Sequence, residues 1–190
     1  MMEQQAIQLI KKELDTKRFE HSLRVMETAQ KLAKRYEAPV EKVVLASLLH
    51  DYAKCRTREE LRNNVKEYTL PNELLDYHHE LWHGPITAKE LKELYGISDE
   101  TILNAIYYHT TGHPVLELVE VIVFVADYIE PARNIPGVEK VRELAEINIY
   151  DAARAAIKNT IIYLMQQNAT IHPDSFSAYN EWTKKTKGGN

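Results

Sequence analysis

The sequence contains little of several residue types that mark particular classes of protein. Its single cysteine, Cys55, excludes a framework of internal disulfides. Only 6 glycines and 7 prolines interrupt the 190 residues, and the two-residue alternation typical of β-strands is scarce. The net charge of −4 provides no overall positive field, so we expect no nucleic-acid partner. An anionic ligand would therefore have to be held by a local cluster of cations.

The sequence also lacks the apolar segments that direct a chain to a membrane. The first residues, MMEQQAIQLIKKELDTKRF, mix charged and apolar side chains and contain no continuous apolar stretch of the signal-peptide kind. No window approaches the ~18 uncharged apolar residues of a membrane-spanning helix. We therefore expect a cytoplasmic protein that does not bind a membrane.

What the sequence does contain is apolar residues at helical spacing. We predict six helical segments, the last of which holds one helix or two: 20–36, 38–54, 84–96, 98–112, 114–131 and 137–168. Segment 38–54 is apolar nearly all round, which is typical of a helix at the centre of a domain. Ser98 and Gly112 are expected to bound the fourth segment. The prediction is an all-α protein with a single domain over 1–183 and a disordered tail over 184–190.

Six ionisable side chains do not fit this helical pattern. They lie at the ends or edges of the most apolar segments, where an unpartnered neutral polar group costs roughly 2–7 kcal/mol. A single buried histidine is more often a hydrogen-bonded core residue than a ligand, but six such groups would each need a buried partner. The six are His21, His50, Asp51, His83, His109 and Asp127.

A metal ion would satisfy several of these groups at once. Imidazole and carboxylate are donors that suit Fe, Mn, Co or Zn in hydrolytic sites, and the absence of a thiolate set argues against structural zinc. Because adjacent residues differ by about 100° around a helix, His50 and Asp51 can reach one ion only beside the last turn of their helix. We therefore expect a metal site at the end of segment 38–54.

The order of these residues on helices, His21, then His50-Asp51, then Asp127, resembles that of the HD-domain metal-dependent phosphohydrolases. The resemblance narrows to the YqeK-type bacterial HD proteins through motifs that follow one another over most of residues 18–181: HSLRV, LLHDYAK, HGPITA, YYHTTG, ADYIEPARNIPGVEKVRELA and HPDSFSAYN. Members of that family are symmetrical dinucleoside tetraphosphatases. The resemblance implies an HD-domain helical bundle that uses metal-activated water to hydrolyse diadenosine tetraphosphate, or a related dinucleoside polyphosphate, to two ADP or GDP-like products.

The resemblance also implies which residues hold the metal. The ligands of the first metal, which is iron in the family and for which manganese or cobalt would serve, match His21, His50, Asp51 and Asp127. His83 and His109 match additional histidines that either complete a second metal site, bridged by Asp51, or face the phosphates. Asp51 and His50 are then the expected catalytic residues.

Substrate-binding roles follow from the same resemblance. Arg133 matches the family's phosphate-facing arginine, a role that a planar guanidinium suits, and Ala132 precedes it where we expect glycine. Arg18, Lys54 and Thr110 are placed to point toward the same mouth. The nucleotide pocket, with a phenylalanine as its stacking surface, would be lined by Ile171, His172, Pro173, Asp174, Ser175 and Phe176.

Three other functions remain open at this point. The chain could be another HD-domain phosphohydrolase that acts on nucleoside monophosphates or on guanosine polyphosphate alarmones. It could be a catalytically idle module that binds a nucleotide or a partner protein, although the intact set of histidines and aspartates argues against this. The histidines could also be purely structural. The apolar excess of the later helices permits a homodimer.

Overall fold

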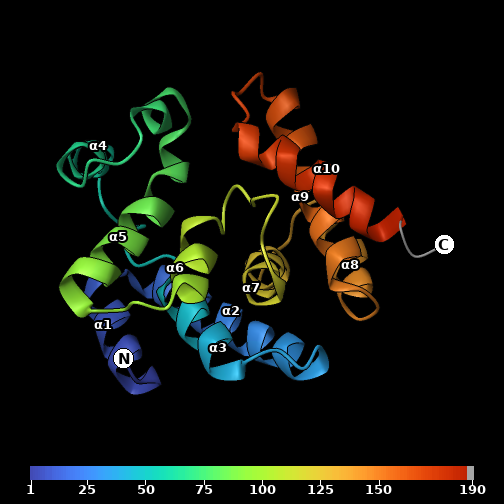
Figure 1. Cartoon of the computed structure of the whole chain (residues 1–190), viewed down its shortest axis with the longest axis horizontal. Coiled ribbons are helices and arrows are strands. Elements are labelled where there is room, and N and C mark those ends of the chain that lie inside the picture. The colour runs from blue at the N-terminus through green and yellow to red at the C-terminus, as the bar shows by residue number, and fades with distance from the viewer. Residues whose placement is uncertain (188–190) are drawn as a thin grey trace.

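The computed structural model describes residues 1–187, and within them it contains helices joined by turns and loops and no β-strand, which confirms the predicted all-α fold (Figure 1). None of the described helices is both long enough and apolar enough to cross a membrane. In chain order the elements are α1 (Glu3–Glu13), α2 (Thr16–Arg35), α3 (Val40–Leu49), α4 (Arg58–Glu67), the 3-10 helices η1 (Asn72–Asp76) and η2 (His79–Leu81), α5 (His83–Tyr95), α6 (Glu100–Tyr107), α7 (Leu118–Ile129), α8 (Val138–Ala145), α9 (Ile149–Gln166) and α10 (Pro173–Lys187).

Helix α3 is shorter than the predicted segment 38–54. It ends at Leu49, and the chain then turns through residues 50–55 before α4 begins. His50 and Asp51 therefore stand at the point where the buried helix gives way to a turn. This confirms that the pair lies beside the last turn of its helix.

The prediction that Ser98 caps the helix of segment 98–112, which is α6, is wrong. The cap of α6 is Asp99, whose carboxylate accepts hydrogen bonds from two N–H groups of the first turn. A carboxylate also interacts favourably with the positive end of the helix dipole, which a hydroxyl does not do. The helix ends at Tyr107, five residues before Gly112, whose φ of 65° closes the turn that follows.

The apolar side chains form two cores. One lies between α2, α7, α8, α9 and α10, and the other between α1, α3, α4, α5 and α6. Helix α7 contributes to both, since Val125 belongs to the first core and Val123 to the second. Figure 1 shows α7 end-on near the middle of the molecule, with α5 and α6 on one side and α8, α9 and α10 on the other. The six polar residues singled out in the sequence lie along the seam between these cores.

The C-terminal helix extends further than predicted. Trp182 of α10 is fully buried, and its ring centroid lies 5.1 Å from that of Phe124 in α7. This anchor lets the helix continue, so residues 184–187, predicted to be disordered, are helical instead. The remainder of the predicted tail, 188–190, lies outside the described residues.

Candidate active site

The carboxylate of Asp51 occupies the centre of the candidate site. The residue is only 3% exposed, and its Oδ1 atom faces two imidazoles. The Nε2 atom of His83, at the start of α5, lies 3.0 Å from this oxygen, and Nε2 of His109, just after α6, lies 3.7 Å from it. The two Nε2 atoms are themselves 2.9 Å apart. Segments far apart in the sequence thus meet at one carboxylate oxygen.

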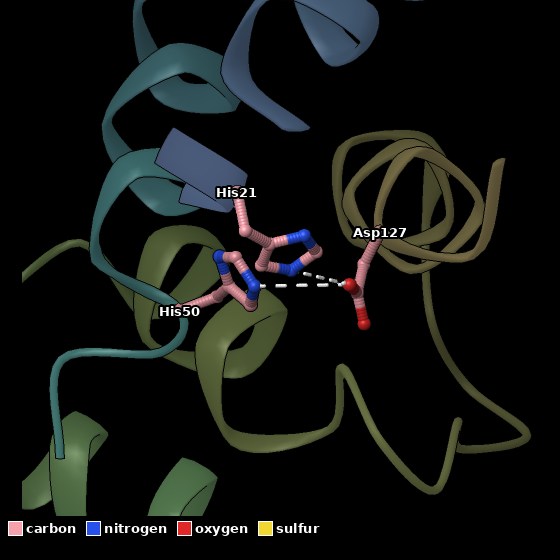
Figure 2. Close-up of side chains that lie close together, drawn as sticks. All are labelled: His21, His50 and Asp127. Carbon is pink, nitrogen blue, oxygen red and sulfur yellow. Dashed lines mark ion pairs between the residues drawn. The ribbon is translucent and has the colours of Figure 1, made fainter. Parts of the chain in front are cut away.

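A second group of ligand atoms, from the three residues drawn in Figure 2, lies near Oδ2 of Asp51. His21 of α2 and His50 both direct Nε2 toward Oδ1 of Asp127 in α7, at 3.0 and 3.9 Å. Neither of these buried Nε2 atoms has a hydrogen-bond partner among the described residues. Oδ2 of Asp51 lies 3.8 Å from Nε2 of His21 and 3.6 Å from Nε2 of His50, which joins the two groups.

The second ring nitrogen fixes the orientation of the His50 and His109 imidazoles. Nδ1 of His50 lies 2.7 Å from the backbone oxygen of Ser47, and Nδ1 of His109 lies 2.7 Å from that of Ile106. A carbonyl oxygen can only accept, so Nδ1 carries the proton and Nε2 presents a lone pair to the centre. Lone pairs that converge without donors are the arrangement expected of metal ligands, and the residues present fit a divalent cation.

The ligand atoms fall into two overlapping sets. His21, His50 and Asp127 form one set, and His50, Asp51 and His109 form the other; within each, the ligand atoms lie within 4.8 Å of one another. Imidazole and carboxylate donors of this kind suit Fe, Mn, Co or Zn. The structure therefore brings together all four residues predicted to hold the first metal, together with both additional histidines.

Glu130 belongs to this site but was not assigned a role from the sequence. It is 2% exposed, and its Oε1 atom lies 3.2 Å from Nδ1 of His21. Its other oxygen accepts a hydrogen bond from Nε of Arg24 at 2.8 Å. A carboxylate behind a ligating histidine orients the ring and raises its basicity. The available signal was spacing: Glu130 follows Asp127 by three residues, and Arg24 follows His21 by three.

The electrostatics of the site keep Asp51 and Asp127 charged and the imidazoles of His50 and His83 neutral. Burial would raise the pKa of Asp51, but the neighbouring imidazoles of His50, His109 and His83 hold it well below its usual range. Burial would also raise the pKa of Asp127, but Arg133 and His21 lower it well below that range. Burial lowers the pKa of His50 to about 4 and, together with the Lys54 ammonium, that of His83 to about 4.

Two arginines complete the predicted mouth of the site. Nη1 of Arg18 lies 3.1 Å from Oδ2 of Asp51, and Nη2 of Arg133 lies 2.6 Å from Oδ1 of Asp127. Each guanidinium is one-third exposed, so it reaches both the cluster and the solvent. Thr110 is half-buried, and its hydroxyl has no hydrogen-bond partner among the described residues.

Lys54 has a different partner from the one expected. Its ammonium forms an ion pair with Glu80 of η2. No role was predicted for Glu80 from the sequence. The ammonium remains close enough to His83 to affect its pKa.

The late segment predicted to line a nucleotide pocket is divided by the structure. His172, Pro173 and Asp174 line a groove of about 380 Å³, opposite Tyr77 and Tyr107. The remaining residues of the segment point elsewhere. Ile171 packs against the core around α7 and α9, Ser175 is buried and donates a hydrogen bond to the backbone oxygen of Thr111, and Phe176 is 45% exposed outside the groove.

The fold and the site define the class of protein. The family model described as "HD domain" matches residues 18–132, which include all six clustered residues. A solved structure titled as a predicted HD superfamily hydrolase involved in NAD metabolism, from Clostridium acetobutylicum, is 34% identical with a TM-score of 0.90. The match covers 96% of this chain and 97% of the chain in that structure. The chain is therefore an HD-domain protein.

The curated relatives are more specific. Proteins named "Bis(5'-nucleosyl)-tetraphosphatase, symmetrical" are 43% identical in Bacillus subtilis, over 95% of this chain and 97% of the relative, and 45% identical in Halalkalibacterium halodurans, over 93% and 94%. A third, from Staphylococcus aureus, is 40% identical over 93% of this chain and 92% of its own length. The chain belongs to the HD-domain family and, within it, to the family of these symmetrical tetraphosphatases, which confirms the predicted resemblance.

The Glu130 contact predicts an effect on metal binding. Glu130→Gln removes the negative charge behind His21, so the affinity for a divalent metal should fall by about ten- to a hundredfold. Metal titration of the purified variant, with circular dichroism to confirm its fold, measures this. Glu143→Gln, a matched change at an exposed position on α8, should leave the affinity unchanged. A folded Glu130→Gln protein with normal metal affinity would show that the carboxylate does not support the site.

The lowered histidine pKa values predict that the metal-free protein loses stability in mild acid. His50 and His83 have pKa values of about 4 in the folded protein, whereas an unfolded histidine has a value of about 6.5. Between these values the unfolded chain binds more protons, so a fall in pH favours unfolding. The free energy of unfolding, measured in urea, should decrease by up to about 1.4 kcal/mol per pH unit for each histidine.

Two variants separate this effect from general acid sensitivity. His50→Gln should flatten the decline between pH 6.5 and 4.5, whereas His78→Gln, at an exposed position, should not. A free energy of unfolding that is constant over this range in the unaltered protein would mean that the buried imidazoles have the same pKa as in the unfolded chain.

Proposed function

We propose that the protein is a metal-dependent hydrolase that cleaves diadenosine tetraphosphate, and related dinucleoside polyphosphates, symmetrically into two ADP. The observation that carries the proposal is the convergence of unpartnered Nε2 atoms of His21 and His50 on the carboxylates of Asp51 and Asp127. The cluster occurs in a chain that is 40–45% identical, over nearly its whole length, to relatives named as symmetrical tetraphosphatases.

The proposal assigns the metal to particular residues. The first ion would be held by His21, His50, Asp51 and Asp127, and we propose iron, although manganese and cobalt suit the same donors. His83 and His109 would hold a second ion together with Asp51. When bound, such a cation makes water acidic enough to provide hydroxide at neutral pH.

The bond that breaks is the one between a β-phosphorus and the central bridging oxygen. Hydroxide adds to that phosphorus and becomes part of one ADP, while the bridging oxygen leaves with the other ADP and takes up a proton. Arg133 and Arg18, both partly exposed beside the cluster, supply bidentate donors for the phosphate oxygens on which negative charge develops. They provide local positive charge in a chain whose overall charge is −4.

The groove beside the cluster would hold one nucleoside of the substrate. Its walls include aromatic rings, and the rings of Tyr77 and His172 are 4.7 Å apart between centroids. Tyr107 and Pro85 both line the groove. Because Tyr107 precedes His109 by two residues and Pro85 follows His83 by two, the groove begins next to the clustered histidines. Flat rings of this kind bind a nucleobase by stacking.

Product identification tests the proposed activity directly. The protein, loaded anaerobically with iron or with Mn²⁺, should convert diadenosine tetraphosphate to ADP alone. Asp51→Asn should lose metal and activity together, because it removes the charge of a residue proposed as a ligand of both ions. Products of ATP and AMP would contradict symmetrical cleavage. A metal-free, folded protein that still bound nucleotide would instead favour a non-catalytic module.

A second test separates the two aromatic candidates in the late segment. His172→Ala should raise KM for the dinucleotide by about tenfold, with kcat little changed, because stacking on a base is worth about 1–3 kcal/mol. Phe176→Ala should leave both constants unchanged, since this ring lies outside the groove. If Phe176→Ala raised KM and His172→Ala did not, the nucleoside would lie elsewhere.

A further inference from the structure

A dinucleotide carries two nucleosides, and the groove that His172 lines accounts for only one of them in the proposed reaction. Symmetrical cleavage leaves one nucleoside and two phosphates on each side of the bond that breaks. The other nucleoside therefore needs a site of its own, on a different side of the metal cluster. Since the first groove begins next to His83 and His109, the second site is to be sought beside Asp127 and Arg133.

A second groove lies at this position. It has a volume of about 540 Å³ and lies between the end of α7, the loop that follows α7, and α9. Its lining includes Tyr128, which follows Asp127 directly, and Ile135, two residues after Arg133. In Figure 1, α9 lies on the opposite side of α7 from α5 and α6, the helices next to the first groove. The clustered ligands thus lie between the two grooves.

The lining of the second groove suits an uncharged, flat group. Every described residue that lines it is uncharged, so the groove does not attract a phosphate. Ile135, Ile162 and Tyr163 are large apolar side chains that nevertheless remain exposed there. The ring of Tyr163 in α9 is 59% exposed, and an exposed aromatic ring binds a nucleobase by stacking. The groove therefore fits the nucleoside end of the substrate.

Two amide side chains of the groove can bind the edge of a base. Asn159 of α9 donates a hydrogen bond from Nδ2 to the hydroxyl oxygen of Tyr128 at 3.2 Å, which holds the amide in place. An amide has two N–H donors and a carbonyl oxygen, so Asn159 can still donate to a ligand and accept from it. Gln166 also lines the groove. Paired donors and acceptors of this kind match the N6 and N7 edge of adenine.

Arg133 connects the second groove with the metal cluster. Its Nη2 atom lies 2.6 Å from Oδ1 of Asp127. Burial raises the pKa of the Tyr128 hydroxyl, and the Asn159 amide and the Arg133 guanidinium act against this rise, so the guanidinium lies near this wall of the groove. A phosphate bound by Arg133 would therefore place the nucleoside attached to it at the entrance of the groove.

We propose that the groove between the end of α7 and α9 is the second nucleoside site for a dinucleoside polyphosphate, in which Tyr163 stacks on the base and Asn159 binds its edge. The proposal rests on the proposed function for the identity of its ligand. Each half of the dinucleotide then has its own groove, and the exposed apolar side chains of the second groove are covered when the substrate binds. A mononucleotide fills one groove only, so the second groove favours dinucleotides.

Calorimetric titration of the metal-loaded protein with a dinucleotide that resists cleavage tests the site. The probe is diadenosine tetraphosphate with a methylene group in place of the central bridging oxygen. Tyr163→Ala should weaken its binding by about tenfold, because one stacked base loses its ring, whereas Tyr163→Phe, which keeps the ring, should not. Met165→Ala, at another exposed apolar position of α9 but outside the groove, should also have no effect. Inorganic tetraphosphate, which carries no nucleoside, should bind all these proteins equally.

A double variant tests whether the two grooves hold different nucleosides. Tyr163→Ala and His172→Ala together should weaken binding of the probe by about a hundredfold, the product of their separate effects. If Tyr163→Ala had no further effect in a protein that already carries His172→Ala, both side chains would act on one nucleoside and the proposal would be wrong. Equal weakening of the probe and of tetraphosphate by Tyr163→Ala would show an effect on the phosphates or the fold, which also overturns it.

Sedimentation of the same proteins tests a different occupant of the groove. If Tyr163→Ala converted a dimer into monomers, the groove would be an interface between two copies of the chain, and the proposal would be overturned. The probe is not cleaved, so the binding pattern is independent of turnover. A protein that showed the expected pattern but did not convert diadenosine tetraphosphate to ADP would refute the proposed function and leave the second groove as a nucleoside site.

Discussion

The buried carboxylate of Asp51 is the constraint on which the rest of the site depends. Removing an ion from water costs several kcal/mol, so a buried anion requires partners with good geometry. Those partners come from segments distant in sequence: Arg18 and His21 lie on α2, His83 begins α5, and His109 follows α6. The two cores position these helices so that each begins, ends or turns beside one carboxylate.

The six clustered residues could be singled out from the sequence because they lie at the ends or edges of apolar segments, and the resemblance to the HD family then indicated which of them hold the metal. His50, for example, ends a segment that is otherwise apolar on all sides, and only a buried polar contact explains that placement. Glu130 and Glu80 could not be found this way. Their roles depend on distances to His21 and Lys54 across the tertiary structure, and an acidic residue near a helix end is common on any surface. The exposure of Phe176 could not be predicted from the sequence either, since it depends on how α10 packs.

Three cations around the site share one arrangement. Arg18 is paired with Asp51, Arg133 with Asp127, and Lys54 with Glu80. Each of these cationic side chains is therefore held in place by a carboxylate of the protein itself. Held side chains lose less conformational entropy when a ligand arrives, which is the advantage of a preorganised site. The same pairing keeps the local charge balanced, so a polyanion gains attraction only as it replaces the internal carboxylates.

The position of the site on the seam between two cores has a mechanical consequence. His21 and Asp127 lie on α2 and α7, helices that contribute to one core, whereas Asp51, His83 and His109 lie on or next to helices of the other. The set of His21, His50 and Asp127 takes donors from both halves, whereas His50, Asp51 and His109 all follow helices of the second core. An ion held by the set of His21, His50 and Asp127 would therefore link side chains of both cores, in addition to the packing that α7 provides.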